Sequence, residues 1–319
     1  MISRRGHLAA PVAVLAAACA MAGCGGSAAG GVTADGSHGA SSTARHLTTT
    51  RRTRAKPLGA PTLTPAATST APTNFVPAVI WRGRPAVYVA RRTNLALLSF
   101  NQQLVGLRLH SGTVDAGVSG YRYGPAILGS ERGRVVAGFN GGFRLDTNSG
   151  GFYSGGRTGA PLSPGLASIV TYTDGTTDIG AWHEGVPAAG HAVYSVRQNL
   201  HLLISGGRIA PDVSCVICWG ATLGGTATPA RGALGITAAG NLIWAGGEQL
   251  SVLALAQVLR SARVLRAVEL DINPEWVAAY LYGHHGRALS ATAVVPGQPG
   301  VPGQFLAPDS RDFFSVVAR

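Results

Sequence analysis

Arg231-Gly-Ala-Leu-Gly-Ile-Thr237 is a short apolar run, and the stretch that it opens, up to Tyr282, decides the fold. A Gly240-Asn241 pair separates this run from Leu242-Ile-Trp-Ala245. Such a pair between apolar runs supplies the positive φ angles that a tight turn needs. The two runs therefore predict a β-hairpin.

A helix and a further strand are expected after this hairpin. Ser251 is a typical N-cap, and apolar residues recur at helical spacing over 250–262. Residues 264–270 then predict a buried strand, whose end delivers Asp271-Ile-Asn-Pro-Glu-Trp276. Two carboxylates, an amide and an indole thus follow one strand end, which makes this loop the first place to expect chemistry.

Strand-like runs also occur on both sides of this stretch. They are separated by turn residues and lie at 86–90, 96–100, 105–110, 135–139, 166–173, 176–182, 199–204 and 313–317. Helical periodicity over a long window is convincing only at 250–262. The sequence therefore predicts an α+β fold with β-rich mixed sheets and one main amphipathic helix, not an alternating βαβ series.

The composition sets wide limits on the function. The 319 residues, of which 46% are hydrophobic and 13% are charged, suffice for one good-sized core or two small ones. The formal net charge is +12, and residues 1–57 hold seven basic groups and one acid. Lys56 is the only lysine, and this arginine bias suggests a GC-rich genome. The basic balance is thus weak evidence for a nucleic-acid partner, and we expect none.

The N-terminus has the pattern of an export signal. Arg4-Arg5 precede an apolar run of signal-peptide length, and the run ends in Met21-Ala-Gly-Cys24, which resembles the lipobox of bacterial lipoproteins. We expect a signal peptide at 1–23, a lipid on Cys24 and anchoring to the outer face of the cell membrane. An ordinary secretory signal with a chance cysteine is the alternative, and the twin-arginine export route stays open.

A tether is expected between the lipid and the folded domain. Residues 24–73 are rich in Gly, Ser, Ala, Thr and Pro and contain almost nothing that can bury apolar surface. Such a segment cannot offset its ordering entropy. The folded domain is accordingly expected at 74–319.

Cys215 and Cys218 lie in this folded domain, on the oxidising side of the membrane if the chain is exported. A local disulfide that clamps a loop is the preferred interpretation. A redox pair lacks the strand–helix setting of thioredoxin-like motifs, and a zinc site lacks a second cysteine pair. Two free thiols are a further alternative.

Three motifs occur in an order that resembles the phosphodiester glycosidase family. They are Asn140-Gly-Gly-Phe143 after a buried strand, Arg231-x-Ala-Leu-Gly-Ile236, and the strand end Leu270-Asp271. In that family an Asn-Gly-Gly-Phe loop, a strand that begins with arginine, and a Leu-Asp-Gly-Gly strand end gather at one pocket. The resemblance spans about 95–317, and it rests on the order and spacing of short motifs.

The chain departs from the family pattern directly after Asp271. Ile272 and Asn273 stand where the family has two glycines, which would let a ligand approach the backbone closely. Asp271 carries over and the glycine loop does not. The resemblance therefore implies a divergent bacterial lipoprotein branch, whose substrate or activity has drifted.

Asp271 is the strongest candidate for catalysis. A carboxylate that closes an apolar strand is costly to bury unless it is paired or functional, and a structural ion pair with an arginine is the alternative. Cleavage of a sugar–phosphate linkage needs a second carboxyl group. Glu269 shares a strand face with Asp271, but Glu275 is the preferred partner because its loop faces solvent.

Further side chains are candidates for substrate binding. A guanidinium offers two parallel donors to a phosphodiester, Gly141 and Gly142 can expose N–H groups or merely form a loop, and Trp276 can stack on a sugar or fill the core. The candidate binding set is Asn140, Gly141, Gly142, Arg144, Arg231, Asn273 and Trp276. Asp271 and Asn273 alone are too few ligands for a cation, so no metal or other cofactor is expected.

Two functions from different classes follow. The first is an envelope hydrolase that acts on a sugar 1-phosphodiester or a related glycosidic bond, with a carbohydrate or sugar phosphate as ligand. The second is a non-catalytic lipoprotein that binds a phosphate-bearing cell-wall polysaccharide. Retention of Asp271, Arg231 and Asn140 favours the first, and loss of the glycines after Asp271 favours the second.

Overall fold

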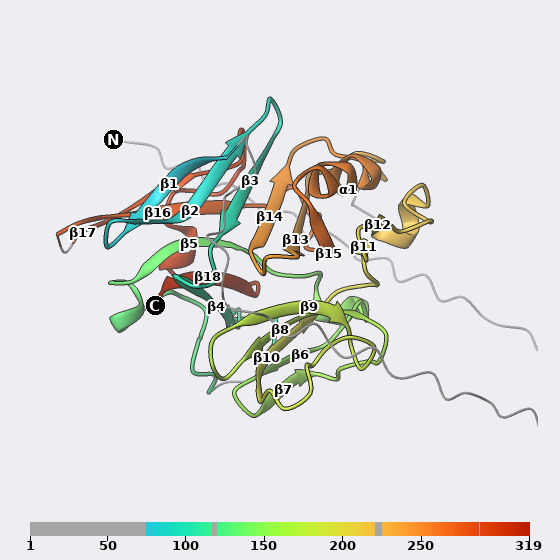
Figure 1. Cartoon of the computed structure of the whole chain (residues 1–319), viewed down its shortest axis with the longest axis horizontal. Coiled ribbons are helices and arrows are strands. Elements are labelled where there is room, and N and C mark those ends of the chain that lie inside the picture. Colours follow the sequence, from blue (N-terminus) through green and yellow to red (C-terminus); the bar gives the residue numbers. More distant parts are fainter. Residues whose placement is uncertain (1–74, 117–119, 221–224, 287) are drawn as a thin grey trace, which may run out of the picture. The chain divides into compact units, whose positions relative to one another are not determined.

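The structure is a computed structural model that describes residues 75–116, 120–220, 225–286 and 288–319. The expected signal peptide at 1–23, the expected lipidation site Cys24 and the expected tether at 24–73 lie outside the described residues. Three β-sheets, in which every strand pair is antiparallel, and one α-helix make up the described part of the chain (Figure 1). The α+β, β-rich class predicted from the sequence is confirmed.

The largest sheet has eight strands and contains the hairpin predicted over 231–245. Its strands run in the order β1 (Val76–Trp81), β2 (Arg84–Arg91), β3 (Leu95–Phe100), β14 (Leu242–Gly247), β13 (Arg231–Thr237), β15 (Val264–Glu269), β11 (Ile204–Ser205) and β12 (Arg208–Ile209). Gly240 adopts a φ of 76° at the β13–β14 turn, as the Gly-Asn pair predicts. β15 lies next to β13 in this order. Asp271, which follows β15, therefore leaves the sheet beside β13.

The second sheet has five strands and β5 at its centre. The order is β17 (Ala288–Ala293), β16 (Ala279–His285), β5 (Val135–Asn140), β18 (Phe313–Ala318) and β4 (Val105–His110). β5 pairs with β18 so that Asn140 lies opposite Phe313, and with β16 so that Phe139 lies opposite Ala279. The residues just before β16 and β18 therefore lie beside the end of β5, although they are far from it in sequence.

The third sheet also has five strands, in the order β7 (Arg157–Ala160), β6 (Phe152–Ser154), β10 (Val193–Gln198), β8 (Ala167–Tyr172) and β9 (Thr177–Ala181). Short 3₁₀ turns occur at η1 (Gly129–Glu131), η2 (Leu145–Thr147), η3 (Val216–Trp219) and η4 (Gln304–Leu306). β10 brings its last residues, Arg197 and Gln198, towards the end of β5, which matters for the site.

The helix α1 (Val252–Ser261) confirms the helix predicted over 250–262. Ser251 is its N-cap, and the Ser251 hydroxyl accepts a hydrogen bond of 3.1 Å from the Ala254 N–H. The apolar face of α1 packs on one face of the eight-stranded sheet, where Leu255 and Leu259 meet Leu97 and Ile243. The opposite face of that sheet packs on β5 and β18.

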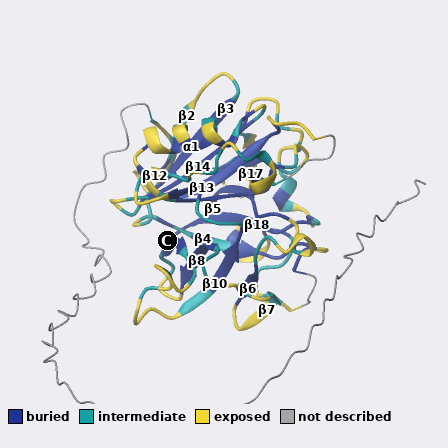
Figure 2. Cartoon of the chain, turned by 90° about the vertical axis from the view of Figure 1, so that its right-hand side faces the viewer, coloured by how far each residue is buried: buried dark blue, intermediate teal, exposed yellow. Residues whose placement is uncertain are grey.

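Strands β3, β13 and β14 are buried on both faces, which explains their predominantly apolar sequence. Phe139 of β5 stands at the junction of the two larger sheets: its ring centroid lies 5.9 Å from that of Phe100 and 5.4 Å from that of Phe314. Figure 2 shows this buried layer running through the middle of the described part. Such aromatic packing fixes the sheets against one another.

Most of the expected strands are present, and one is displaced. The run at 199–204 was expected as a strand, but only Ile204 of it is in one, and the strand β10 precedes it. Asn199 instead uses its side chain to accept from the Phe143 N–H at 3.2 Å and to donate to the Glu269 carbonyl at 2.8 Å. Side-chain bonds of this kind compete with a sheet ladder.

No helix among residues 75–319, as far as they are described, combines the length and the apolarity that crossing a bilayer requires.

Candidate active site

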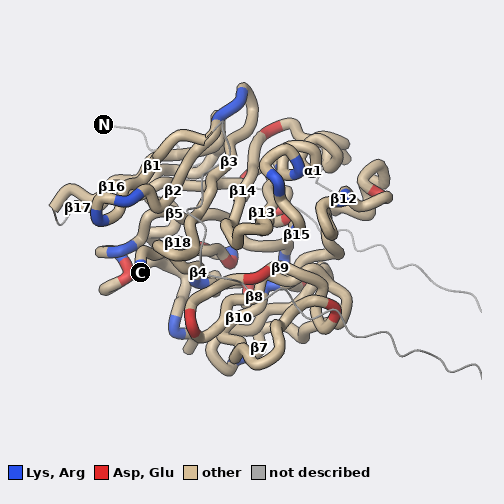
Figure 3. Tube along the Cα trace, viewed as in Figure 1, with Lys and Arg blue, Asp and Glu red and all other residues tan. Residues whose placement is uncertain are grey.

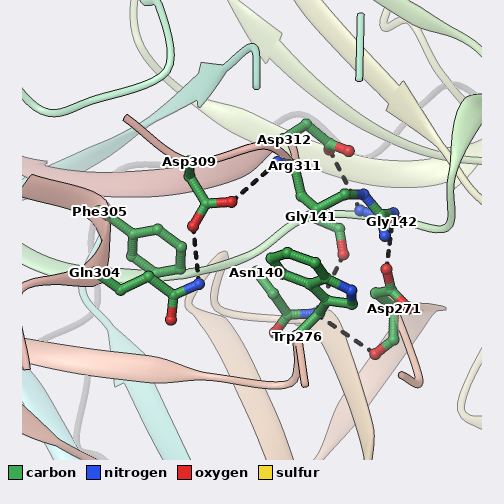
Figure 4. A pocket seen from close by; sticks show the side chains of 10 residues that line it. All are labelled: Asn140, Gly141, Gly142, Asp271, Trp276, Gln304, Phe305, Asp309, Arg311 and Asp312. Atoms are coloured by element: carbon green, nitrogen blue, oxygen red, sulfur yellow. Dashed lines mark hydrogen bonds and ion pairs between the residues drawn. The ribbon is translucent and has the colours of Figure 1, made fainter. Parts of the chain in front are cut away.

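A small pocket lies where the end of β5 meets the residues that precede β16 and β18 (Figure 4). Its cavity measures about 10 Å³, room for about one water molecule. The lining residues are Asn140, Gly141, Gly142, Asp271, Trp276, Gln304, Phe305, Asp309, Arg311 and Asp312. Antiparallel pairing of three strands that are distant in sequence therefore assembles the site.

Asp271 is buried at the edge of this pocket, with 6% of its surface exposed. Its backbone N–H donates to the Gly141 carbonyl at 2.9 Å, and its Oδ1 accepts from the Asn273 N–H at 3.0 Å. Its Oδ2 lies 2.7 Å from Arg311 Nη2. Burial raises the pKa of the Asp271 carboxyl above its ordinary value, and this effect outweighs the attraction of Arg311.

Arg311 is the central cation of the pocket. Its Nε donates to the Asp115 carboxylate, and its Nη2 donates to the Gly142 carbonyl at 3.1 Å as well as contacting Asp271. The guanidinium also lies over the Trp276 ring, 5.6 Å from its centroid. Two carboxylates therefore already share the positive charge of Arg311.

Asp312 forms the second strong ion pair of the site. Arg197, from β10, donates to it in a bidentate manner, at 2.8 Å from Nε and 3.0 Å from Nη2. The Gly142 N–H donates to the same carboxylate at 3.3 Å, and the Gly141 N–H donates to the Asp312 carbonyl at 3.0 Å. This pair ties the third sheet to the end of β5.

The two glycines line the pocket for a reason that the sequence did not reveal. A methyl group at Gly141 would overlap the Asp312 carboxylate, and one at Gly142 would lie 2.7 Å from Arg197 Cζ. Their N–H groups already donate to Asp312 and are not turned towards an anion, contrary to one of our expectations. Gly141 and Gly142 are needed because the ion pair packs directly against their backbone.

Asn140 hydrogen-bonds two of the segments that line the pocket. Its amide nitrogen donates to the carbonyls of Gly141 and Asp271, at 3.2 and 3.5 Å. Its Oδ1 is buried with no hydrogen-bond partner and lies on the side of Gly232. Asn140 therefore joins the ends of β5 and β15 and positions Asp271, instead of pointing freely at a ligand.

Arg231 does not reach the pocket, which corrects the expectation that it lies beside Asn140 and Asp271. Its side chain is fully buried on the α1 side of the sheet, and Nη1 lies 2.6 Å from Glu269 Oε1. The same guanidinium donates to the carbonyls of Leu250 and Trp219 at 3.1 and 3.0 Å. Burial raises the pKa of Glu269 to about 8, against the attraction of Arg231.

Glu275 is also outside the pocket, so it is not placed to act as the partner carboxylate. Its N–H donates to Asn273 Oδ1 at 3.0 Å, and this bond closes a tight turn. The Glu275 side chain is exposed and faces solvent. Asn273 forms this turn and does not line the cavity. Trp276 follows the turn and does line it.

Arg144 lies on the surface beside the pocket and does not line it. Its side chain is 60% exposed and pairs with Asp146, two residues along η2. This pairing satisfies the guanidinium locally. Arg144 is therefore not positioned to hold a ligand in the Asp271 pocket.

Cys215 and Cys218 are joined by a disulfide at η3, the interpretation preferred from the sequence. The segment that they close packs through Trp219, whose indole N–H donates to the Asp212 carbonyl at 3.1 Å. Trp219 in turn accepts the bond from Arg231 described above. The disulfide thus belongs to the sealed face of the sheet and not to the pocket.

Sequence reasoning missed the residues that supply most of the pocket's charge. Asp309-Ser-Arg-Asp312 precedes the buried strand β18, the counterpart of the strand-end signal that singled out Asp271. Asp309 accepts from Gln304 at 2.8 Å and from the Arg311 N–H at 2.9 Å, and it is buried. The sequence signal that could have identified these residues is the presence of three charged residues among four directly before an apolar strand.

The described residues contain no group of three or more His, Cys, Asp or Glu side chains arranged to hold a metal ion. The acids of the pocket are instead bound to arginine or to amide groups. What the arrangement offers is a buried carboxyl with a raised pKa, a shared guanidinium and a second carboxylate that a buried arginine neutralises.

Comparison with known proteins gives distant likenesses only. No protein-family model matches the sequence, and no curated protein matches it. The catalytic domain of zebrafish N-acetylglucosamine-1-phosphodiester alpha-N-acetylglucosaminidase, auto-inhibited by its pro-peptide, is 14% identical with a TM-score of 0.45, over 73% of this chain and 77% of that chain.

Two further solved structures are similar at the same level. A hypothetical protein from Synechocystis is 13% identical with a TM-score of 0.41, over 75% of this chain and 63% of that chain. A protein of Burkholderia pseudomallei K96243 described as exported is 12% identical with a TM-score of 0.33, over 73% of this chain and 75% of that chain. These likenesses are too distant to carry an argument about activity.

Proposed function

We propose that this chain is a hydrolase of the cell envelope that cleaves a glycosidic bond, with sugar 1-phosphodiesters as its substrate class. One observation carries the proposal: a buried carboxyl with a raised pKa, Asp271, lines a pocket next to the guanidinium of Arg311 and a second carboxylate, Asp312. A carboxyl whose pKa is raised keeps its proton nearer to neutral pH, as a general acid must.

The roles follow from these contacts. Asp271 donates a proton to the oxygen that leaves the anomeric carbon as the C1–O bond breaks, and one water molecule then supplies the hydroxyl group that replaces it and returns its other proton to Asp271. Protonated Asp271 no longer neutralises Arg311, so a phosphate oxygen can take its place beside the guanidinium while Asp115 still holds Nε. Asp312, fully buried and paired with Arg197, fixes the Gly141–Gly142 loop that forms one wall of the pocket.

The phosphodiester assignment and membership of the phosphodiester glycosidase family belong to this proposal. They are supported by the order of the motifs at Asn140, Arg231 and Asp271 in the sequence. A phosphate is a good leaving group and reduces the demand for a strong acid. Trp276 is the side chain in the pocket that offers a ring face to a sugar.

Hydrolysis of a small α-GlcNAc 1-phosphodiester by the full chain tests the proposal. Wild type should turn the substrate over, and Asp271→Asn should lower kcat/KM by about a hundredfold or more, the usual share of general acid–base catalysis. Asp146→Asn is the matched control, because Asp146 is an exposed aspartate near the pocket that does not line it. Equal rates in the two variants would contradict the assignment of Asp271.

A non-catalytic binding role is the second candidate, and the size of the cavity favours it. The volume of about 10 Å³ is far below the range of roughly 300–1,000 Å³ common for sites that enclose a small molecule for turnover. The glycine N–H groups and Arg311 are also already engaged within the protein. Saturable binding of a phosphate-bearing wall polysaccharide without turnover of the phosphodiester would select this second function.

Export and lipid anchoring are part of the same proposal and rest on the sequence around Cys24. Palmitate labelling of cells that express the full chain tests them. Labelling that Cys24→Ala abolishes is the expected result. Export of an unlabelled wild-type chain would leave an ordinary secretory signal as the explanation.

A further inference from the structure

A second and larger cavity lies at the opposite end of β18 from the Asp271 pocket. It measures about 300 Å³ and is walled by β4 and β18 of the second sheet and by β8 and β10 of the third. We call it the basic groove, defined by Arg108, Arg122, Tyr123, Arg134, Tyr194 and Arg319 among its lining residues. Nothing in the proposed hydrolase uses it.

Positive charge in this groove exceeds the negative charge that lines it. Arg108 lies 3.3 Å from Glu131, and Arg319 donates to the carbonyls of Val105 and Asp174. The exposed Arg134 side chain has no hydrogen bond or ion pair with any residue that the structure describes. In the view of Figure 3 basic positions are spread over several elements, so the groove is a local concentration of charge and not part of one basic face.

Asp174 is the acid that lines the groove, and it is occupied by its own turn. Its Oδ1 accepts from the Thr176 N–H at 2.7 Å and from the Thr176 hydroxyl at 2.6 Å. The pKa of Asp174 is lowered by these bonds, despite the opposing effect of partial burial. The carboxylate therefore does not neutralise Arg122 or Arg134 across the groove.

The aromatic rings of the groove are not free to stack on bases. Arg108 and Arg122 both lie over the Tyr123 ring, 4.9 and 5.6 Å from its centroid, and Tyr194 meets the same ring edge-on at 6.0 Å. Proteins that bind single-stranded nucleic acid need open aromatic faces for stacking. Tyr123 instead holds two guanidinium groups in position, of which Arg108 is paired with Glu131 and Arg122 also bonds the Tyr194 side chain.

We propose that the basic groove binds a carbohydrate that carries phosphate groups, with Arg122 and Arg134 as the phosphate-binding residues. A guanidinium offers parallel donors that match a phosphate. The hydroxyl groups of Tyr123 and of exposed Thr173 line the same groove and suit the hydroxyl groups of a sugar. A sugar phosphate can use both the guanidinium groups and the hydroxyl groups of the groove.

The groove and the Asp271 pocket are separate sites on one strand. Phe313 begins β18 beside Asn140 at the pocket, whereas Val317 and Ala318 at its other end line the groove. The inference therefore stands independently of the proposed hydrolase. Asp271→Asn leaves binding in the groove unchanged if the two sites are distinct.

Isothermal titration calorimetry of the full chain tests the inference, with glucose 6-phosphate, inorganic phosphate and glucose as probes. Glucose 6-phosphate should bind at least about tenfold more tightly than glucose, and Arg122→Ala and Arg134→Ala should each weaken its binding about tenfold, the worth of one charge-assisted hydrogen bond. Arg132→Ala is the matched control, since Arg132 is an exposed arginine of the same loop that does not line the groove.

Other outcomes overturn the inference. They are no saturable binding of glucose 6-phosphate, an equal loss of binding in Arg132→Ala, and loss of binding in Asp271→Asn, which would place the ligand in the pocket. Binding to vesicles of anionic phospholipid or to a single-stranded oligonucleotide that depends on Arg122 and Arg134, without binding of glucose 6-phosphate, would assign the groove to another partner. Thermal unfolding of each variant checks that these exposed substitutions leave the fold intact.

Discussion

Glu269 and Asp271 lie two residues apart at the end of β15, and their carboxyl groups enter two different environments. Glu269 is sealed on the α1 side of the sheet against Arg231, and both side chains have no exposed surface. Asp271 has turned away from the sheet, is bound to Arg311 and lines a cavity. Both carboxyls have raised pKa values through burial, yet only the one with an opening can exchange a proton with a ligand.

The contrast between Glu269 and Asp271 shows that a raised pKa does not by itself identify a catalytic group. The Glu269–Arg231 pair leaves Glu269 Oε2 and Arg231 Nη2 buried without partners and has no access to solvent. The Asp271–Arg311 pair is joined by Trp276, Asp312 and the two glycines in one pocket. We therefore assign a structural role to the sealed pair and a chemical role to the open one.

Breaking the sealed pair should have the largest effect on stability. Arg231→Met leaves Glu269 buried without a cation, and we expect the free energy of unfolding to fall by about 3–5 kcal/mol. The double variant Arg231→Met/Glu269→Leu should recover most of this loss because it removes both charges. Urea denaturation measures both.

Arg266→Met is the control for that experiment. Arg266 pairs with Asp178 at 2.6 Å, but the two side chains are 30% and 18% exposed, so its loss should cost about 1 kcal/mol or less. If Arg231→Met cost no more than Arg266→Met, the sealed pair would not be the structural element that we take it to be.

The glycines of the open site give the next largest effect. Gly141→Ala places a methyl group onto the Asp312 carboxylate, and we expect a loss of about 1–3 kcal/mol in unfolding free energy together with weaker turnover. Gly185→Ala is the matched control, because a Cβ there meets nothing within 4 Å. Chemical denaturation that ranks the two variants equally would argue against tight packing of the Asp312–Arg197 pair on the loop.

Substitution of Trp276 should weaken substrate binding more than it lowers the stability of the fold. Trp276→Ala removes the ring that faces the pocket, and KM for the α-GlcNAc phosphodiester should rise about tenfold, while kcat changes less. Trp182→Ala removes another partly buried tryptophan that does not line the pocket, and its KM should match that of wild type. Steady-state kinetics separate the two, and an unchanged KM in Trp276→Ala would remove the indole from the binding site.

The smallest effect, and the one whose sign is most informative, concerns the stability of Asp271→Asn. The folded protein holds the Asp271 proton more tightly than the unfolded chain does, so the contribution of this group is complete at low pH and is lost as pH rises through its raised pKa. Asparagine does not ionise. The variant should therefore gain stability relative to wild type as pH rises above about 3.9, the ordinary pKa of aspartate; a difference that falls with pH would mean that the pKa is lowered instead.

The sequence was sufficient for the elements whose signals are local. Ser251, the Gly240-Asn241 turn and the continuous apolar runs predicted the helix, the hairpin and the buried strands, because caps, turns and periodicity depend on near neighbours. Asp271 and the loop that begins with Asn140 were singled out for the same reason, since each follows directly on a buried strand.

The partners of these residues could not be predicted because they depend on strand pairing over long separations. β5 and β18 are paired across more than half of the described chain, and only this register brings Arg311 and Asp312 to Gly142. Arg231 was expected at the pocket from its position at a strand start. Its side chain points to α1, whereas the chain beyond Leu270 turns towards Gly141 and carries Asp271 to the other side.

The most direct test of the central claim compares turnover by Asp271→Asn with turnover by Arg231→Met/Glu269→Leu, on the same α-GlcNAc 1-phosphodiester and at equal concentrations of folded protein. We expect the double variant to keep kcat/KM within about threefold of wild type, whereas Asp271→Asn should lose about a hundredfold or more. Loss of activity in the double variant with full activity in Asp271→Asn would contradict it, because the sealed carboxyl and not the open one would then perform the chemistry.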